Sequence, residues 1–413
     1  MAARATVSLR SDVPGAKEGL QVAAPGALVM GADYRALGVV RSLGRKKIPV
    51  WLINQGGHHV AAVSRFVTRR VRWPVAHQAA QIEFLLELGF QNNLNGWALI
   101  PTDDYAVALL AHHHKILQQI YRVTIPPWEQ IRWLCDKRLL SCLAQKLSIH
   151  QPFQACPANR EQLARIDCPF PVILKPALRL QPTSLSIPKA WPAVDRKTLL
   201  AQFDAASSVI APENLIVQET VPGGGENQFS FAALCRDGSP LAWMVARRTR
   251  QYPKDFGQFS TFVETVDEPQ IIEPATRLLA ELRFTGLAEV EFKYDCRDGR
   301  FKLLDVNPRV WGWHTLSRRV GIDFPYLLWR LVNGKTVPIL FGRAGERWMH
   351  ATGDLRVAIG EILRGNLPLP QYLRTFLPST ESPIFAWDDP LPGFLDLPLF
   401  MYTFGKRLLS SVA

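Results

Sequence analysis

The chain has 413 residues, 47% apolar and 20% charged, a composition that predicts a globular protein of two or three domains and excludes a disordered one. No run approaches the ~18 uninterrupted apolar residues of a membrane helix, and no apolar core follows Arg4 and Arg10, so we expect neither a transmembrane segment nor a secretory signal. The net charge of +12 predicts attraction to anions, but no motif favours nucleic acid, and attraction to anionic lipid has equally little support.

The first elements predict a parallel sheet. After residues 1–25, which we expect to form a mobile tail, Ala27–Met30 is a short apolar strand. A helical pattern then runs through Val39 and Leu43, and Ile48–Ile53 is the next strand. Strand, helix and strand in this order are typical of a βαβ unit. The GxGxxG motif is absent, so a dinucleotide site is not supported.

Acidic and histidine residues follow the next strand, Ala98–Ile100. Asp103 and Asp104 are placed to cap a helix, the interpretation we favour, or to help bind an amine-bearing acceptor. His112–His114 do not predict a metal site, because consecutive helical residues diverge by about 100° and cannot converge on one ion.

Three lysines occur in the next part of the chain. A linker at Pro126–Trp128 precedes a helical run, Trp133–Lys146, that contains Lys137. Pro169–Lys175 is an apolar strand that ends in lysine, and a buried ammonium is costly unless it meets an anion. Lys175 therefore either binds phosphate or emerges into solvent at the end of the sheet. Lys189 lies in the irregular, proline-containing stretch that follows.

A strand, a hairpin and a basic cluster come next. Leu215–Thr220 is an apolar strand, and the sequence predicts a hairpin of Phe229–Leu234 with Leu241–Ala246 around Asp237-Gly238. Arg247 and Arg248 then form either a solvated charge run or part of an anion site, which the nearby Tyr252 favours. We expect a loop at 253–262 and an amphipathic helix at 270–283.

The most informative segment is 286–309, GLAEVEFKYDCRDGRFKLLDVNPR, which predicts a β-hairpin. In its first strand Glu289, Glu291 and Lys293 point one way, and in its second strand Asp305 and Asn307 share a face. A three-residue loop, 297–299, would pair Cys296 with Arg300 and set Glu291 opposite Asp305. A two-residue turn at 298–299 would put the two carboxylates on opposite faces.

Oxygen ligands on two rigid strands suit Mg²⁺, which takes a few carboxylates and completes its shell with water and phosphate. The alternative is an ordinary amphipathic hairpin with a solvated acidic face. The sequence Asn307-Pro308-Arg309 favours the metal site, because an amide and a guanidinium directly after the acid are hard to explain as surface residues.

Glu-x-Phe on one strand and Leu-Leu-Asp-Val-Asn-Pro-Arg on the next resemble the metal-binding signature of ATP-grasp enzymes. The similarity is greatest to the branch with biotin carboxylase, the carbamoyl-phosphate synthase large subunit and D-aspartate-type carboxylate–amine ligases, and it covers roughly residues 26 to 335. The family usually has Glu where this chain has Asp305, whose shorter side chain reaches less far.

The resemblance implies an α/β fold: a Rossmann-like domain at 26–125, an ATP-grasp domain at 126–335 with a small mobile subdomain at 170–222, and a C-terminal extension at 336–413. It also implies ATP and Mg²⁺, with Mn²⁺ as an alternative. Arg309 and Lys175 would be catalytic. The implied metal ligands are Glu291, Asp305 and Asn307. The implied nucleotide-binding residues are Lys137, Lys175, Lys189, Gln218, Glu219, Val221, Glu226 and Arg247.

As a member of this family the chain would form an acyl phosphate from ATP and a small-molecule carboxylate, then an amide with an amine, or a thioester with a thiol, releasing ADP and phosphate. Two rivals remain: a ligase that uses bicarbonate, and a non-catalytic nucleotide-binding module. The resemblance is compatible with a homodimer. The function of the proline-rich C-terminal part is not readable, although 347–364 has a helical pattern. Six scattered cysteines without a CxxC pair predict reduced thiols and a cytoplasmic protein.

Overall fold

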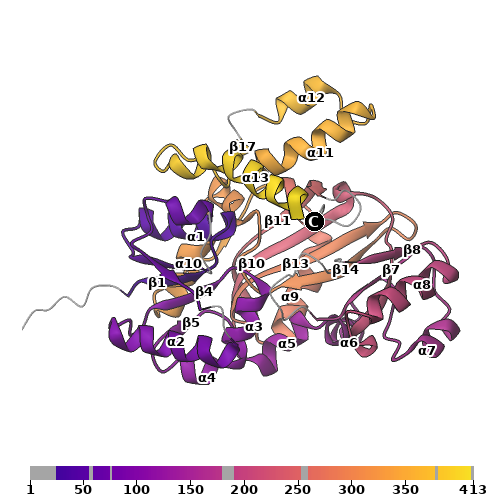
Figure 1. Cartoon of the computed structure of the whole chain (residues 1–413), viewed down its shortest axis with the longest axis horizontal. Helices are drawn as coiled ribbons and strands as arrows, with labels where there is room; N and C mark the ends of the chain where they lie inside the picture. Colours follow the sequence, from indigo (N-terminus) through magenta and orange to yellow (C-terminus); the bar gives the residue numbers. More distant parts are fainter. Residues whose placement is uncertain are drawn as a thin grey trace, which may run out of the picture.

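The structure of the chain is a computed structural model that describes residues 25–54, 59–74, 77–178, 190–252, 259–376 and 380–410. Its strands form three sheets. A five-stranded and a four-stranded sheet lie at opposite ends of the molecule, with an eight-stranded sheet between them (Figure 1). The predicted tail and Lys189 lie outside the described residues.

The first sheet is parallel throughout, with the strand order β3-β2-β1-β4-β5. The strands predicted at 27–30, 48–53 and 98–100 are confirmed, each within two residues. The strands are β1 Ala27–Met30, β2 Val50–Asn54, β3 Arg69–Arg72, β4 Ala98–Pro101 and β5 Arg122–Val123. The helices of this part are α1 Tyr34–Arg45, α2 Gln78–Gln91, α3 Asp104–His112 and α4 His114–Leu117.

The four-stranded sheet has the order β6-β9-β7-β8 and its own hydrophobic core, which includes Leu174, Phe203 and Val217. It begins before residue 170, because β6 belongs to it. Its elements are β6 Gln154–Ala155, α7 Arg160–Arg165, β7 Val172–Pro176, β8 Trp191–Ala193, α8 Arg196–Ser207 and β9 Leu215–Glu219. A separate core means that this sheet is stabilised largely by its own contacts.

The eight-stranded sheet has the order β14-β13-β10-β11-β12-β16-β17, and β15 pairs with β11. The predicted hairpin at Asp237-Gly238 is confirmed, and both turn residues have positive φ, as a two-residue turn of this kind requires. The predicted loop at 253–262 is wrong for 259–262, which belong to β12, and its residues 253–258 lie outside the described part of the chain. The strands are β10 Gln228–Arg236, β11 Ser239–Tyr252, β12 Phe259–Thr265, β13 Gly286–Asp295, β14 Arg300–Asn307, β15 Leu340–Phe341, β16 Arg347–Met349 and β17 Thr380–Glu381.

Helices from the middle of the chain pack on this sheet or join it to the first: α5 Trp128–Cys135, α6 Lys137–Lys146, α9 Ile272–Glu281 and α10 Phe324–Val332. The single helix predicted at 133–146 is wrong, because the chain breaks at Asp136. The Asp136 side chain accepts from the Arg138 amide and so caps a new helix, as Asp commonly does. Lys137 is consequently the first residue of α6.

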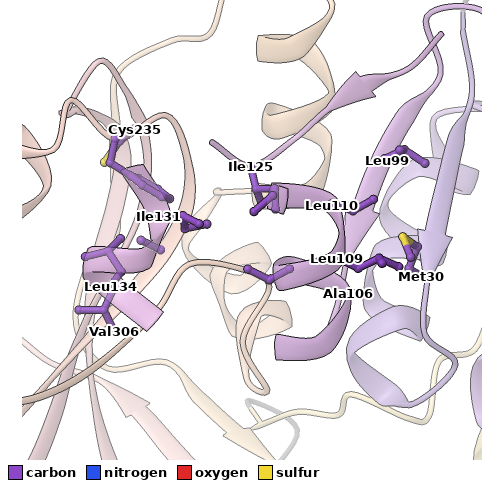
Figure 2. Close-up of a cluster of buried hydrophobic side chains, with 14 of the residues drawn as sticks. Met30, Leu99, Ala106, Leu109, Leu110, Ile125, Ile131, Leu134, Cys235 and Val306 are labelled. Carbon is purple, nitrogen blue, oxygen red and sulfur yellow. The ribbon is translucent and has the colours of Figure 1, made fainter. Parts of the chain in front are cut away.

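One continuous hydrophobic core joins the first sheet to the large one. Figure 2 shows it running from Met30 and Leu99 on the first sheet, through α3 and the α5 side chains Ile131 and Leu134, to Val306 on β14. All of these side chains are at most 4% exposed. The ends of β1 and β4 are thereby held in a fixed place relative to the hairpin β13–β14.

The C-terminal part is more regular than its prolines suggest. The predicted helix at 347–364 is right from residue 351 onward, and its first residues form β16. Helices α11 Ala351–Leu363, α12 Leu369–Arg374 and α13 Leu391–Ser410 lie together along one side of the molecule (Figure 1). Among the described residues, no helix has the length and apolar character needed to cross a membrane. The 3-10 segments are η1 Val60–Val63, η2 Pro212–Asn214, η3 Gly225–Asn227, η4 Pro269–Ile271 and η5 His314–Val320.

Candidate active site

The register of β13 and β14 is as predicted, but it arises differently. Glu291 lies opposite Asp305. The turn has four residues, 296–299, and pairs Asp295 with Arg300, which by itself would bring Leu304 opposite Glu291. A β-bulge at Leu304 adds one residue to β14 and restores the register. The predicted pairing of Cys296 with Arg300 is therefore wrong, and the facing carboxylates are confirmed.

The carboxylates of Glu289 and Glu291 are buried side by side and share partners. The Arg248 guanidinium pairs with both, at 3.2 Å from Glu289. The Asn307 amide donates to Glu291 at 2.7 Å and to Glu289 at 3.0 Å. Burial raises the pKa of Glu289, while Arg248 opposes that rise. Desolvation acts to lower the pKa of Arg248, but Glu291 and Glu289 more than offset it, so the pKa is raised and the guanidinium stays charged.

Further polar groups fix this buried pair. Gln228 on β10 donates to Glu291 at 2.8 Å, and Ser230 donates to Glu289 at 3.0 Å. The indole N–H of Trp313 also donates to Glu289, at 2.9 Å. Both carboxylates are thus surrounded by donors: Glu289 accepts from Ser230, Arg248, Asn307 and Trp313, and Glu291 accepts from Gln228, Arg248 and Asn307.

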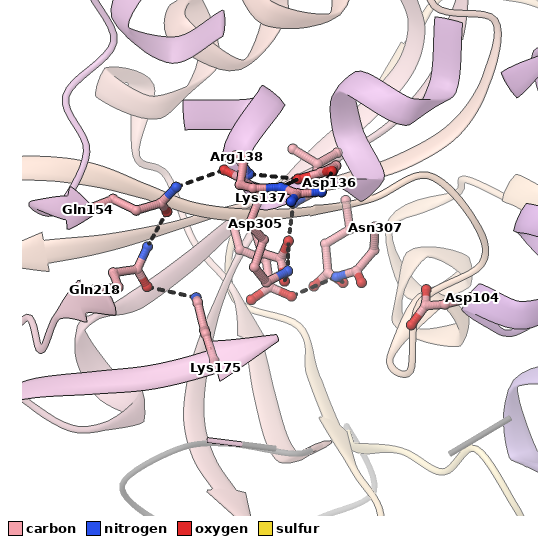
Figure 3. Close-up of polar contacts among 12 residues, drawn as sticks. Asp104, Asp136, Lys137, Arg138, Gln154, Lys175, Gln218, Asp305 and Asn307 are labelled. Carbon is pink, nitrogen blue, oxygen red and sulfur yellow. Dashed lines mark hydrogen bonds and ion pairs between the residues drawn. The ribbon is translucent and has the colours of Figure 1, made fainter. Parts of the chain in front are cut away.

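Asp305 faces a lysine from another element. Its two oxygens lie 2.7 and 2.8 Å from Nζ of Lys137, the first residue of α6 (Figure 3). The Asp305 side chain is 32% exposed and that of Lys137 is 17% exposed, so the pair is open on one side. The lysine and the carboxylate predicted for phosphate and metal are therefore in contact.

A chain of hydrogen bonds connects Lys137 to the small sheet (Figure 3). Lys175 on β7 donates to Gln218 on β9 at 2.7 Å. The amide of Gln218 contacts Gln154 at 3.4 Å, and Gln154 donates to the backbone oxygen of Lys137 at 3.0 Å. The two predicted phosphate lysines thus lie on either side of this amide pair.

The other predicted nucleotide residues have partners of their own. Glu219 is buried and pairs with Arg297 in the hairpin turn. Glu226 folds back onto the amide of Gly224 at 2.9 Å. Arg247 pairs with Glu264 at 3.3 Å, and Val221 is buried. The structure brings none of these four side chains to Glu291 or Asp305.

Arg309 connects the hairpin to the edge of the first sheet. Its guanidinium donates to Oδ1 of Asn307 at 3.1 Å and to Asp104 at 2.6 Å. Desolvation would raise the pKa of Asp104, but the charge and hydrogen bond of Arg309 lower it to about 2. Asp103 caps α3 by accepting from Ala106 at 2.8 Å, which confirms the capping interpretation for that residue.

A second acid–base pair lies at the same edge. Asp33 caps α1 and pairs with Arg35 at 2.6 Å. Arg35 influences the pKa of Asp104 and of Arg309, so these charges act on one another. Parallel sheets bind ligands beyond the carboxyl ends of their strands, where the strand order reverses, and β1 and β4 meet at such a point.

Three features of the site were not assigned from the sequence: the roles of Glu289 and Arg248, and the contact of Asp104 with Arg309. Glu289 shares the face of Glu291 by simple alternation, so its position was available as a signal. The sequence could not show which of Arg247 and Arg248 points toward the hairpin carboxylates, because β11 is irregular next to Arg248. The contact of Asp104 with Arg309 spans 205 residues and leaves no local pattern.

The oxygen donors of the hairpin fit Mg²⁺ in the way that nucleotide enzymes hold it. Among the described residues, no group of three or more His, Cys, Asp or Glu side chains is placed to hold a metal by itself. Mg²⁺ is usually held by one or two carboxylates together with phosphate, not by a complete protein cage. Glu291, Asp305 and the Asn307 amide oxygen supply such a partial set on one face.

Comparisons with known proteins agree with the fold and the motif. Residues 211–345 match the family model described as ATP-grasp in the biosynthetic pathway with Ter operon. A D-aspartate ligase of Enterococcus faecium (strain Aus0004) is 23% identical over 252 residues, which cover 55% of this chain and 57% of the ligase. The chain thus spans little more than half the length of that curated relative.

Solved structures show the same fold. An L-amino acid ligase from Bacillus licheniformis has a TM-score of 0.60 at 15% identity and covers 75% of this chain and 74% of its own. The biotin carboxylase domain of Hydrogenobacter thermophilus 2-oxoglutarate carboxylase, in complex with MgADP, ADP and bicarbonate, has a TM-score of 0.62 at 13% identity, with 78% and 73% covered. The hairpin motif, the match of residues 211–345 and the shared fold thus all make the chain similar to ATP-grasp proteins.

Proposed function

We propose that the chain is an ADP-forming ligase that activates a carboxylate as an acyl phosphate and joins it to an amine. The observation that carries this proposal is the position of Arg309. Its guanidinium contacts Asn307 on the metal-ligand face and Asp104 at the edge of the first sheet. A carboxylate held by Arg309 would therefore lie beside the phosphate that the hairpin face binds, which is the proximity that phosphoryl transfer needs.

In this proposal Glu291, Asp305 and Asn307 hold Mg²⁺. When bound, the ion neutralises charge on the phosphate oxygens of ATP. Lys137 and Lys175 supply positive charge to the same oxygens, and their present partners, a carboxylate and an amide, are groups that a phosphate can replace. Arg248 pairs with both Glu289 and Glu291 and so offsets their negative charge. Gln218, Glu219, Val221, Glu226 and Arg247 remain proposed nucleotide-side residues, with backbone groups as the contacts for those whose side chains are already engaged.

We assign the parts of the chain as follows. Residues 26–125, with the parallel sheet, form a Rossmann-like substrate domain, and residues 126–335 form the ATP-grasp domain. Within it, 170–222 belong to the small nucleotide-side subdomain, which its separate core supports. Residues 336–413 are an extension. Asp33 and Asp103, at the carboxyl ends of β1 and β4, are placed to attract the ammonium of an amine-bearing acceptor.

A bicarbonate-using ligase is the second candidate, because a structural neighbour is a biotin carboxylase domain that is solved with bicarbonate. A thiol acceptor and a non-catalytic nucleotide-binding module complete the alternatives. One experiment separates them: ADP release from Mg·ATP is measured across a panel of carboxylates, each with hydroxylamine present. A carboxylate that gives both ADP and a hydroxamate supports the acyl phosphate. ADP with bicarbonate alone favours the second candidate, and nucleotide binding without any ADP favours the module.

A further inference from the structure

Most of the large hydrophobic side chains that are exposed among the described residues lie in the C-terminal part of the chain. Of seventeen large hydrophobic side chains that are exposed among the described residues, eleven lie between 355 and 401. A water-soluble domain normally covers its outward helix faces with polar side chains. A concentration of this kind marks a surface that meets something other than water.

Helix α11 is turned with its apolar stripe outward. Leu355, Ile359 and Leu363 are spaced four residues apart and are 47%, 49% and 82% exposed. The opposite side of the helix packs inward, where Ala358 is buried and Asp354 is bonded to Arg250 on β11. This arrangement is the reverse of an ordinary surface helix, because its polar contact is inside and its apolar stripe is outside.

Helices α12 and α13 repeat the pattern. Leu369 and Leu373 of α12 are more than half exposed, while Tyr372 between them is buried. Along α13 the exposed residues recur every three or four positions, and Trp387, just before the helix, is 89% exposed. Helices α11 and α13 are in contact, and all three lie on one side of the molecule (Figure 1). We define the C-terminal apolar face as Leu355, Ile359, Leu363, Leu369, Leu373, Trp387, Leu391, Phe394, Leu397 and Met401.

The acidic residues around this face are already engaged within the protein. Each described acidic residue of these elements is bonded within the protein: Asp354 to Arg250, Glu361 to Arg364, Glu381 to Arg318, Asp388 to Arg45, Asp389 to Arg41 and Asp396 to Thr352. Arg374 is exposed and makes no ion pair within the described part of the chain, and Arg364 is 69% exposed. The chain as a whole carries a net charge of +12.

We propose that the C-terminal apolar face docks on the surface of an anionic lipid membrane. Amphipathic helices that carry Trp, Phe and Leu on one side lie in the headgroup region, and nearby Arg residues add attraction to anionic lipids. A second copy of the chain fits less well, because it would bring another chain of net charge +12 and a second Arg374 against acidic residues that are already bonded within the protein. This proposal concerns location and does not depend on the ligase reaction.

The test is flotation of the full-length chain with vesicles of phosphatidylcholine alone or with 30 mol% phosphatidylglycerol, at low and high salt. We expect at least tenfold tighter binding to the anionic vesicles, reduced by high salt. The double variant Leu363→Glu/Phe394→Glu should lose at least tenfold of that binding. Phe90→Glu is the matched control, because Phe90 is 72% exposed, like Phe394 at 70%, but lies on α2. Arg374→Glu should reduce the difference between binding to the anionic vesicles and binding to the neutral ones.

Three outcomes would overturn the proposal. The first is no flotation with either vesicle, and the second is equal flotation with neutral and anionic vesicles. The third is an oligomer in light scattering that the double variant dissociates while vesicle binding is absent, which would assign the face to a second copy. Circular dichroism and thermal unfolding of each variant show whether the substitution acts on the surface alone, as these high exposures predict.

Discussion

Replacement of Arg248 by Met tests whether its guanidinium compensates the charge of two buried carboxylates. The guanidinium pairs with Glu289 and Glu291, and all three side chains are at most 10% exposed. Removing it leaves two carboxylates close together, away from water and without a cation. Breaking a buried ion pair by removing one partner costs about 3–5 kcal/mol, because the remaining charge keeps its desolvation penalty.

The neighbouring residue provides a matched control. Arg247 has the same side chain on the same strand, but it is 39% exposed and pairs with a 22% exposed Glu264 at 3.3 Å. Partly exposed pairs of this kind contribute about 0–1 kcal/mol. Arg247→Met should therefore change the free energy of unfolding by about 1 kcal/mol or less, although the same number of charges is removed.

The measurement is urea-induced unfolding of both variants, followed by intrinsic fluorescence and by circular dichroism at one protein concentration. The expected result is a midpoint well below that of the unmodified chain for Arg248→Met, and nearly unchanged for Arg247→Met. Equal midpoint shifts for the two variants, or a loss of less than about 1 kcal/mol in the free energy of unfolding for Arg248→Met, would refute the view that Arg248 compensates two buried carboxylates.

Other substitutions address the reaction and its pH range. Glu291→Gln preserves shape but removes a proposed metal ligand, so equilibrium titration should show weaker Mg·ATP binding and turnover should be lost with the fold intact; turnover at the unmodified rate would contradict the site. Arg309→Ala should lose hydroxamate formation by at least about tenfold while nucleotide affinity changes little, since the guanidinium is proposed to hold the carboxylate; equal losses would count against that role. Asp104 has a folded pKa near 2, below its usual value of 3.8, so its pairing stabilises the fold above about pH 4 and that stability is lost as the pH falls toward 2. The free energy of unfolding of Asp104→Asn should therefore be lower than that of the unmodified chain at pH 6, and the two values should converge near pH 2. A difference that stays constant with pH would rule the linkage out.

The local pattern of the sequence was sufficient for most of the hairpin. Alternation placed Glu291, Asp305 and Asn307 on one face, because a strand has a period of two residues. The turn length and the bulge at Leu304 were not predictable, because each changes the pairing by only one residue. The predicted register is right only because these two differences compensate. The break at Asp136 was visible in principle as a capping residue within a helical pattern.

Side-chain roles that depend on distant contacts were not predictable from the sequence. Nothing in the sequence distinguishes Glu219 from any acidic residue at a strand end, and only the fold shows that it forms an ion pair with Arg297. Choosing between Arg247 and Arg248 required the irregular stretch of β11, which alters the faces of neighbouring residues. In the C-terminal part the density of proline concealed α12 and α13, although proline is tolerated in the first turn of a helix, as at Pro370 and Pro392.

The carboxylates of the proposed metal face are paired with cations: Asp305 with Lys137, and Glu291, together with Glu289, with Arg248. In the proposed function, a divalent cation bound to Asp305 would release Lys137, and phosphate oxygens bound to Lys137 would release Asp305. Each ligand alone therefore meets a cost that the other ligand removes, which is positive thermodynamic coupling. Under the proposed function we therefore predict that Mg²⁺ and the nucleotide each bind more tightly when the other is bound.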